Sequence, residues 1–230
     1  LDLDTVGAVA GHSLGEYTAL VAAAALTPRS GAKLVAARGD AMQAAADAHP
    51  GTMAAVLGLD PEVVARACAG IDGAWVANDN APGQVVISGT VEGVDAAGQL
   101  ARELGAKRVL PLAVGGAFHS PLMAPAADQL RTALEAADFQ RAAVPVVANV
   151  DADAHQDGWP ARLGAQLTSP VRWRQSLVTL AGLGVTHFLE LGPGVELSGM
   201  VKRSVDGAAR ANVATPADLV GLPGFAEGTR

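Results

Sequence analysis

VGAVAGHSLGEY, residues 6–17, joins two different patterns. A short apolar run typical of a buried strand ends at Gly11, and Glu16 to Leu26 is rich in Ala and Leu and contains neither Gly nor Pro. This change predicts a strand that turns abruptly into a helix at Ser13. In a G-x-S-x-G pattern the glycines leave room for a tight turn, and the helix start offers N–H groups to an oxyanion. Ser13 is therefore a candidate nucleophile, with a structural turn serine as the alternative.

The residues that follow predict an alternation of helices and strands. Thr27-Pro28 can start a helix that runs to about Ala48. After the break at His49-Pro50-Gly51, alternating patterns predict strands at 52–57, 74–77, 84–88 and 107–114 and helices at 61–69 and 90–104. Their order, βαββαβ, is that of a ferredoxin-like unit. We therefore predict a subdomain at residues 50–112, inserted into a core made of residues 1–49 and 113–230.

The C-terminal part of the sequence continues the alternation. The patterns predict helices at 123–137, 161–167, 171–180 and 195–203 and strands at 144–150 and 186–191. Strands alternating with helices indicate an α/β fold whose parallel sheet is covered on both faces. The tail, residues 206–230, is too rich in Gly, Pro and Ala to assign.

Composition narrows the class of protein. With 50% hydrophobic and 17% charged residues the chain is globular, and a net charge of −7 without any Lys/Arg block argues against nucleic acid as a partner. The single Cys68 excludes an internal disulfide and fits a reducing compartment. No apolar run approaches the ~20 residues of a membrane helix. We expect a cytoplasmic protein that binds no membrane and, lacking CxxC or paired-His spacing, no metal.

A serine nucleophile needs a base, and five histidines are available. His119 follows Gly115-Gly116-Ala117-Phe118 just after a strand end, where an α/β sheet presents its ligand-facing loops. His12 adjoins Ser13, so its side chain is expected to diverge from the serine. The pattern therefore favours His119 as the base, with a loop histidine as the alternative. Structural or exposed roles are expected for the other three, His49, His155 and His187.

Six motifs carry a resemblance to a known family. GHSLGEY, RGDAMQ, NDNAPGQVVISG, FHSPLM, QLTSPVRW and LELGPGVELSGMVKR occur in this order between Val6 and Arg203. Together they resemble malonyl-CoA:acyl carrier protein transacylases and the acyltransferase domains of polyketide synthases. The resemblance implies an α/β-hydrolase-like core with an inserted ferredoxin-like subdomain. It also implies coenzyme A thioester and acyl carrier protein as partners, no cofactor and, for free-standing members, often a monomer.

The resemblance assigns roles to the matching positions. Ser13 would attack the thioester of malonyl-CoA, and His119 would take its proton and return it to the departing thiol. Arg38 would pair with the free malonyl carboxylate, which suits a guanidinium fork; a solvated helix arginine is the alternative. The main-chain carbonyl of Gln166 would orient the histidine. The N–H of Leu14 would be one oxyanion donor.

Acyl preference follows from the same comparison. The family tends to place a bulky aromatic such as Phe118 before the histidine when the substrate is malonyl, and Leu14 points the same way. We therefore predict that malonyl is preferred over methylmalonyl as the acyl group.

Three other residues, Asn80, Asn149 and Ser88, also match motif residues of the family, although structural roles are equally expected for them.

The family pattern begins with a strand and a GQGSQ-like segment whose glutamine supplies another oxyanion N–H. No such segment precedes Val6, so we expect an N-terminal part of the protein to lie outside this sequence. One alternative is therefore a non-catalytic homologue acting as a docking module.

A second alternative is a serine thioesterase or esterase of the α/β-hydrolase type. That class needs an Asp between Ser13 and His119 in the chain, and the predicted subdomain fills that interval, which makes this alternative less favoured.

An acyl carrier protein is typically acidic, so a local basic patch is expected near the serine. The short basic clusters available are Lys107-Arg108, Arg172-Arg174 and Lys202-Arg203.

Overall fold

The strand–turn–helix unit at Ser13 is present in the computed structural model, which describes residues 5–222. Strand β1 covers Val9–Ala10 and helix α1 covers Gly15–Ala22. The helix ends four residues before the predicted end at Leu26 because Ala24 adopts a left-handed φ of +57°. The Ala25 N–H then donates to the Leu20 carbonyl at 2.9 Å, which closes a Schellman-type end.

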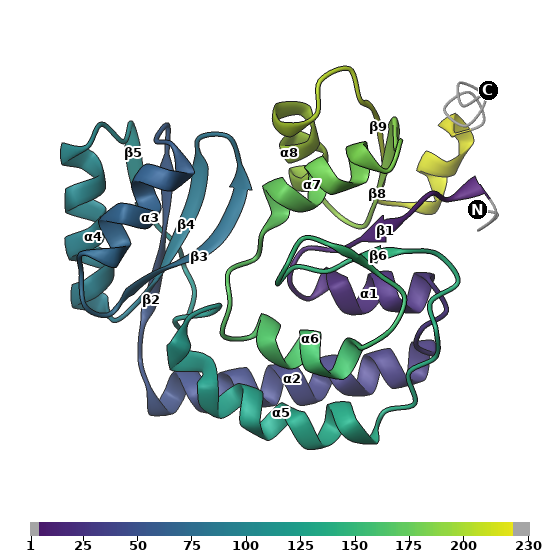
Figure 1. Ribbon diagram of the computed structural model, residues 1–230, viewed down its shortest axis with the longest axis horizontal. Coiled ribbons are helices and arrows are strands. Elements are labelled where there is room, and N and C mark those ends of the chain that lie inside the picture. The colour runs from purple at the N-terminus through teal and green to yellow at the C-terminus, as the bar shows by residue number, and fades with distance from the viewer. Residues whose placement is uncertain (1–4, 223–230) are drawn as a thin grey trace.

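Helices α2 (Pro28–Ala48), α5 (Ala124–Ala136) and α6 (Trp159–Gln166) lie together along the lower side of the larger lobe (Figure 1). As predicted, α2 begins after Thr27, whose Oγ1 accepts the Ser30 N–H at 3.1 Å. The helix α5, preceded by the short turn η2 (Pro121–Met123), contacts both α2 and α6. Buried side chains of these helices and α1 form one core; its largest members include Tyr17, Leu20, Leu34, Leu130, Leu134, Trp159 and Leu163.

The strands of the larger lobe are short. Within residues 5–222, β1 pairs in parallel with β6 (Val146–Val147), which pairs antiparallel with β7 (Ala154–His155). A separate parallel pair joins β8 (His187–Leu191) to β9 (Ala209–Val213). The helices α7 (Trp173–Gly182) and α8 (Glu196–Ser204) pack against each other and share a second core with both sheets. The α/β class is as predicted, but the described parallel strands form two pieces rather than one sheet.

The smaller lobe has the βαββαβ order that the sequence predicts. Its four strands form an antiparallel sheet in the order β3-β4-β2-β5. Both helices pack on one face of this sheet, over Val56, Val85 and Ile87. In chain order its elements are β2 (Thr52–Leu57), α3 (Pro61–Ala69), β3 (Ala74–Ala81), β4 (Gln84–Gly89), α4 (Val91–Glu103) and β5 (Arg108–Pro111). The division at residues 50 and 112 remains our proposal.

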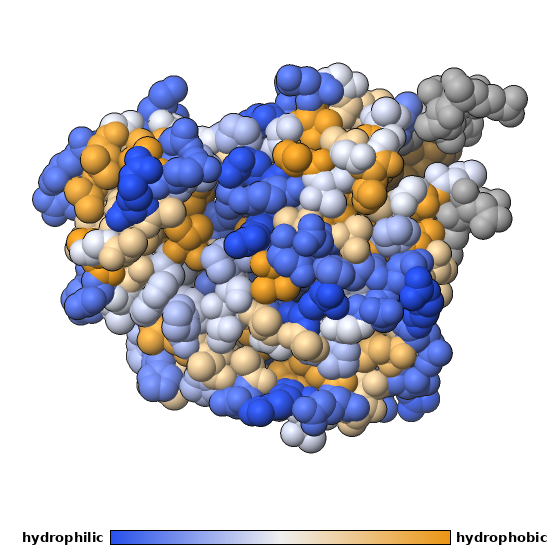
Figure 2. All heavy atoms as spheres, in the orientation of Figure 1, coloured by the Kyte–Doolittle hydropathy of each residue, from blue (hydrophilic) through white to orange (hydrophobic). Residues whose placement is uncertain are grey.

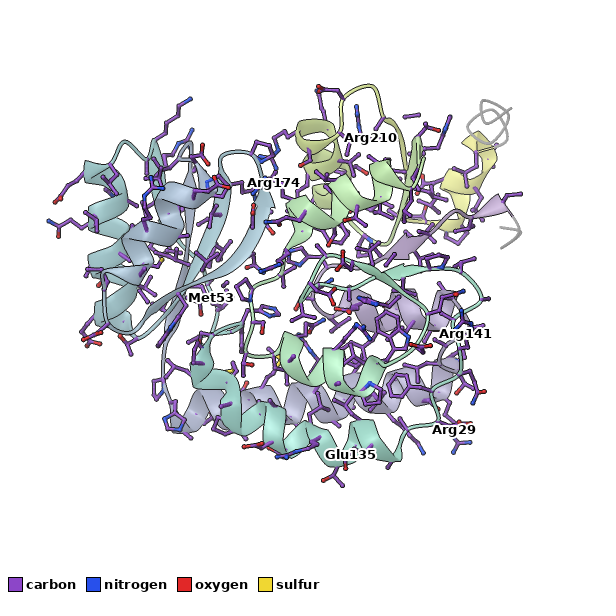
Figure 3. The ribbon with its side chains drawn as sticks, in the orientation of Figure 1. Arg29, Met53, Glu135, Arg141, Arg174 and Arg210 are labelled. Carbon is purple, nitrogen blue, oxygen red and sulfur yellow. The ribbon has the colours of Figure 1, made fainter. Side chains whose placement is uncertain are left out.

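The second half of β3 docks the smaller lobe on the larger one. Strand β3 runs to Ala81, four residues beyond the prediction, because its last residues still pair with β4. The same stretch also pairs with the larger lobe, where the Asp79 N–H donates to the Val171 carbonyl at 2.9 Å. The Asp79 carboxylate accepts hydrogen bonds from Arg174 Nε at 2.9 Å and Nη2 at 2.8 Å. Arg174 lies at the start of α7, facing the smaller lobe (Figure 3), and hydrophilic surface lies between the lobes (Figure 2).

The tail that the sequence left unassigned carries β9 and a short 3-10 helix, η3 (Pro216–Gly221). Strand β9 forms because each of its residues pairs with one of β8, a long-range partner that local composition does not reveal. Positions 223–230 of that tail lie outside the described residues. None of the helices in residues 5–222 combines the length and apolarity needed to span a bilayer.

Candidate active site

Ser13 sits at a strained turn between β1 and α1. Its φ is +53°, a left-handed value that a non-glycine residue adopts at an energetic cost. A Cβ on Gly11 would lie 1.9 Å from the Gly15 carbonyl oxygen, so only glycine fits at position 11, where the end of β1 passes close to the start of α1. Asn149 holds the turn from the other side: its Oδ1 accepts the Ser13 N–H at 2.6 Å and its Nδ2 donates to the Gly11 carbonyl at 2.8 Å.

His119 lies in the loop after β5, and its side chain contacts the Ser13 hydroxyl. The loop residue has a φ of +58°, and its Nε2 lies 2.8 Å from Ser13 Oγ. Its Nδ1 lies 3.0 Å from the main-chain carbonyl oxygen of Gln166. Since a carbonyl oxygen only accepts, Nδ1 carries the proton and Nε2 presents a lone pair to the serine hydroxyl. This tautomer is the one a general base requires.

Burial keeps His119 neutral. The side chain lies in the interior, where desolvation disfavours the imidazolium, and the charges of Arg38 and His12 add to this effect; together they lower the pKa of His119 to about 4. The hydrogen bond to the Gln166 carbonyl opposes the shift without cancelling it. At neutral pH the imidazole is therefore free to accept a proton.

Arg38 brings a buried positive charge to the same hydroxyl. It projects from the middle of α2 with 5% of its surface exposed. Its Nη2 donates to Ser13 Oγ at 2.9 Å and to Gln166 Oε1 at 3.3 Å, and its guanidinium carbon lies 5.9 Å from the centre of the Tyr17 ring. A guanidinium stays protonated even when buried, so a cation and a neutral imidazole flank one serine oxygen.

Glu16 is a site residue that our sequence reasoning missed. It occupies the first turn of α1 and is fully buried, with its Oε2 accepting Gln166 Nε2 at 2.6 Å and the Asn149 N–H at 3.3 Å. Burial raises the pKa of Glu16 to about 7. A signal was available: Glu16 is the one charged residue in the apolar helix that follows Ser13.

The remaining predicted residues lie around this centre. Leu14 precedes α1, 48% exposed, and within residues 5–222 its N–H has no hydrogen-bond partner. Phe118 packs between the main core and a cluster under the smaller sheet that includes Met53 (labelled in Figure 3). Asn80 Oδ1 binds His12 Nε2 at 2.8 Å, which turns His12 away from the serine as expected. Ser88 is buried in β4, and its hydroxyl has no hydrogen-bond partner among residues 5–222.

A pocket of about 360 Å³ opens beside His12 and Asn80, on the flank of the serine turn. Its other wall is the loop between β8 and α8 together with the start of α8, including Gly192, Pro193, Leu197 and Met200. Glu190 fixes that wall by accepting the N–H groups of Leu197 at 3.1 Å and Ser198 at 2.7 Å. Within the described residues, no group of three or more His, Cys, Asp or Glu is placed to hold a metal ion.

Known proteins are similar to this chain in sequence and in architecture. The family model described as "Acyl transferase domain" matches residues 4–222. A malonyl CoA-acyl carrier protein transacylase of Bacillus subtilis (strain 168) is 49% identical over 200 residues, which are 84% of this chain and 63% of that protein. An acyl-carrier-protein S-malonyltransferase structure from Burkholderia pseudomallei 1710b superposes with a TM-score of 0.89 at 45% identity, covering 94% of this chain and 72% of that one.

One solved relative includes its partner. It is a type II polyketide synthase acyl-carrier protein in complex with its malonyl-transacylase, at 42% identity and a TM-score of 0.89, covering 93% of this chain and 71% of that one. The chain spans 63% of the length of the Bacillus subtilis relative and 66% of that of a malonyl CoA-acyl carrier protein transacylase from Escherichia coli (strain K12).

Proposed function

The chain belongs to the acyl transferase family, and from that premise we propose that it moves a malonyl group from coenzyme A, through an ester on Ser13, to the phosphopantetheine thiol of an acyl carrier protein. One observation carries the proposal. Ser13 Oγ lies 2.8 Å from a neutral imidazole nitrogen of His119 and 2.9 Å from the Arg38 guanidinium. The hydroxyl thus has a base for its proton and, beside it, a cation for a carboxylate-bearing acyl group.

In the first half-reaction, His119 Nε2 takes the Ser13 proton as Oγ attacks the thioester carbon. Negative charge develops on the carbonyl oxygen, to which the Leu14 N–H, at the start of α1, is a suitable donor. The carbon–sulfur bond then breaks, and the imidazolium returns the proton to the departing thiolate. The products are free coenzyme A and malonyl-Ser13.

The second half-reaction runs the same steps with a different thiol. His119 deprotonates the carrier thiol, whose sulfur attacks the ester, and the proton goes back to Ser13 Oγ as the serine leaves. The Gln166 main-chain carbonyl oxygen orients His119 in both half-reactions by accepting the hydrogen bond of Nδ1–H, with 3.0 Å between the nitrogen and the oxygen. The Arg38 guanidinium, free of any carboxylate within 4 Å among the described residues, would pair with the malonyl carboxylate.

The thioesterase alternative has less support. An ordinary hydrolase triad places a carboxylate on the second nitrogen of the histidine. Here that nitrogen faces a carbonyl, which orients the ring but supplies no negative charge. Transfer to the thiol of an acyl carrier protein should therefore exceed transfer to water by a wide margin. Hydrolysis at an equal or higher rate would favour the thioesterase.

For carrier docking we favour Lys202-Arg203 among the three basic clusters. Both side chains are exposed on α8, the helix whose Leu197 and Met200 line the pocket beside the serine turn. Arg174, by contrast, is engaged by Asp79. The acidic carrier would meet this helix by charge complementarity.

The test is a transfer assay with malonyl-CoA and a phosphopantetheinylated acyl carrier protein. We expect malonyl transfer by the chain, none by Ser13→Ala, and a raised KM for the carrier in a Lys202→Glu, Arg203→Glu variant. An unchanged KM in that variant would remove the α8 cluster from the docking surface. Equal transfer by Ser13→Ala would contradict the function itself.

A further inference from the structure

Glu16 is a fully buried carboxylate beside the site that the reaction steps above do not use. Only one of its oxygens, Oε2, has partners; Oε1 is buried and has none among residues 5–222. Burying a charged group is costly unless it is paired or hydrogen-bonded. A carboxylate kept in this place therefore needs an explanation in the groups around it.

The side-chain amide of Gln166 is the group it holds. Both Nε2 protons are used, one on Glu16 Oε2 at 2.6 Å and one on the Ser13 carbonyl at 3.0 Å, while Oε1 accepts from Arg38 Nη2 at 3.3 Å. The reverse orientation of the amide would set its oxygen against two acceptors and its NH₂ against a guanidinium. Glu16 thus determines which end of the Gln166 amide faces Arg38.

Glu16 is also a counter-charge for Arg38. Arg38 is 5% exposed, and it has no carboxylate within 4 Å among the described residues. Above its pKa of about 7 Glu16 is ionised, and its negative charge then reaches Arg38 across one amide, through the two hydrogen bonds of Gln166. The polarised amide links carboxylate and guanidinium while leaving the guanidinium free to take a further carboxylate.

We propose that Glu16 is a positioning residue for acyl selection, which through the Gln166 side chain fixes the Arg38 guanidinium beside Ser13 and so favours acyl groups that end in a carboxylate. This inference rests on the proposed function. It differs from the role of the Gln166 main chain, which orients His119. It predicts that Glu16 affects recognition of malonyl and leaves the reaction of a neutral acyl group almost unchanged.

The experiment is a double-mutant cycle on the rate of acyl-Ser13 formation with malonyl-CoA and with acetyl-CoA, which lacks the carboxylate. The variants are Glu16→Gln, Gln166→Met, which keeps the main-chain carbonyl, and both together. The matched control is Glu92→Gln, because Glu92 is the second residue of α4 as Glu16 is of α1, but is exposed. Since charged hydrogen bonds exceed neutral ones by roughly a factor of two in strength, we expect Glu16→Gln to lower kcat/KM for malonyl about tenfold, mainly through KM.

Three further results are expected: acetyl transfer changes less than about twofold, Glu92→Gln behaves as the unaltered chain, and the double variant is no worse than the more impaired single one. Equal losses for both thioesters, no loss with malonyl, or multiplicative losses in the double variant would each overturn the proposal. If Glu16→Gln does not fold, as judged by circular dichroism, Gln166→Met alone must still show the malonyl-selective loss.

A readout independent of acyl transfer separates this inference from the proposed function. In the ¹⁵N-labelled chain the Gln166 side-chain amide signal can be assigned by its disappearance in Gln166→Met. We expect slow exchange of its protons with water in the unaltered chain and in Glu92→Gln, and faster exchange with a shifted signal in Glu16→Gln. An unchanged signal in Glu16→Gln would overturn the positioning role. Absence of malonyl-Ser13 in the unaltered chain would overturn the proposed function instead.

Discussion

Lowering the pH tests the state of His119. With a pKa of about 4, His119 is about nine-tenths neutral at pH 5, whereas the ordinary value of 6.5 would leave about 3% neutral. The rate at which Ser13 Oγ reacts with a neutral sulfonyl fluoride follows the neutral fraction of its base. A neutral reagent is chosen because it does not require Arg38 to bind a carboxylate. We therefore expect this rate to fall by only about a tenth between pH 8 and pH 5.

The assay is the pseudo-first-order rate of sulfonylation, followed by intact mass at a series of pH values. A drop of about thirtyfold with a midpoint between pH 6 and pH 7 would refute the argument from burial. His119→Gln is the control, and its rate should be lower by about 10²- to 10⁴-fold at every pH. Circular dichroism at each pH confirms that the chain remains folded.

The same pKa shift has a consequence for stability, which limits the pH range of the assay. The unfolded chain binds a proton on His119 near pH 6.5 but the folded chain only near pH 4, so between these values the unfolded state binds more protons. Folding stability therefore falls as the pH drops from about 6.5 to about 4, by up to about 3 kcal/mol from this group. At pH 5 about 2 kcal/mol of this stability is already lost, which is why the folded state is checked at each pH.

Three further predictions concern the turn, the lobe junction and the acyl group. Gly11→Ala should lower the free energy of unfolding, measured in urea, by more than about 3 kcal/mol, because the new Cβ would clash with the backbone of Gly15. Gly39→Ala is the control: Gly39 lies in α2 with open space around it, so this change should raise the free energy of unfolding by roughly 0.5–1 kcal/mol. Equal effects of the two changes would contradict the close contact between Gly11 and Gly15. Asp79→Asn should cost about 1–3 kcal/mol by weakening the bidentate contact with Arg174, and an unchanged unfolding midpoint would show the contact to be dispensable. Phe118→Ala should raise kcat/KM for methylmalonyl relative to malonyl by about tenfold, and comparable values for both thioesters in the unaltered chain would refute the predicted preference.

Local patterns predicted most elements because their causes are local. Thr27 and Pro28 start α2 through a side-chain cap and a fixed φ, and the alternation from Thr52 to Pro111 gives a sheet in the predicted chain order. The misses have long-range causes. β9 depends on pairing with β8, and the last residues of β3 pair with Val171 of the other lobe as well as with β4.

The candidate site shows the same division. The spacing around Ser13 and the loop position of His119 were visible in the sequence, and the structure brings the two side chains together. Glu16 stands out in the sequence as the one charged residue of an apolar helix, but its role could not be assigned, because that role depends on Gln166, 150 positions away. Asn149 likewise acquires a definite part in the site only through its contacts with the Ser13 turn.

Brief incubation with malonyl-CoA followed by intact-protein mass spectrometry tests the role of Ser13 most directly. The unaltered chain should gain the mass of one malonyl group, Ser13→Ala should gain none, and addition of a carrier thiol should remove the adduct. A folded chain that gains no malonyl group, or a Ser13→Ala variant that gains as much, would contradict the proposed acyl-serine transfer.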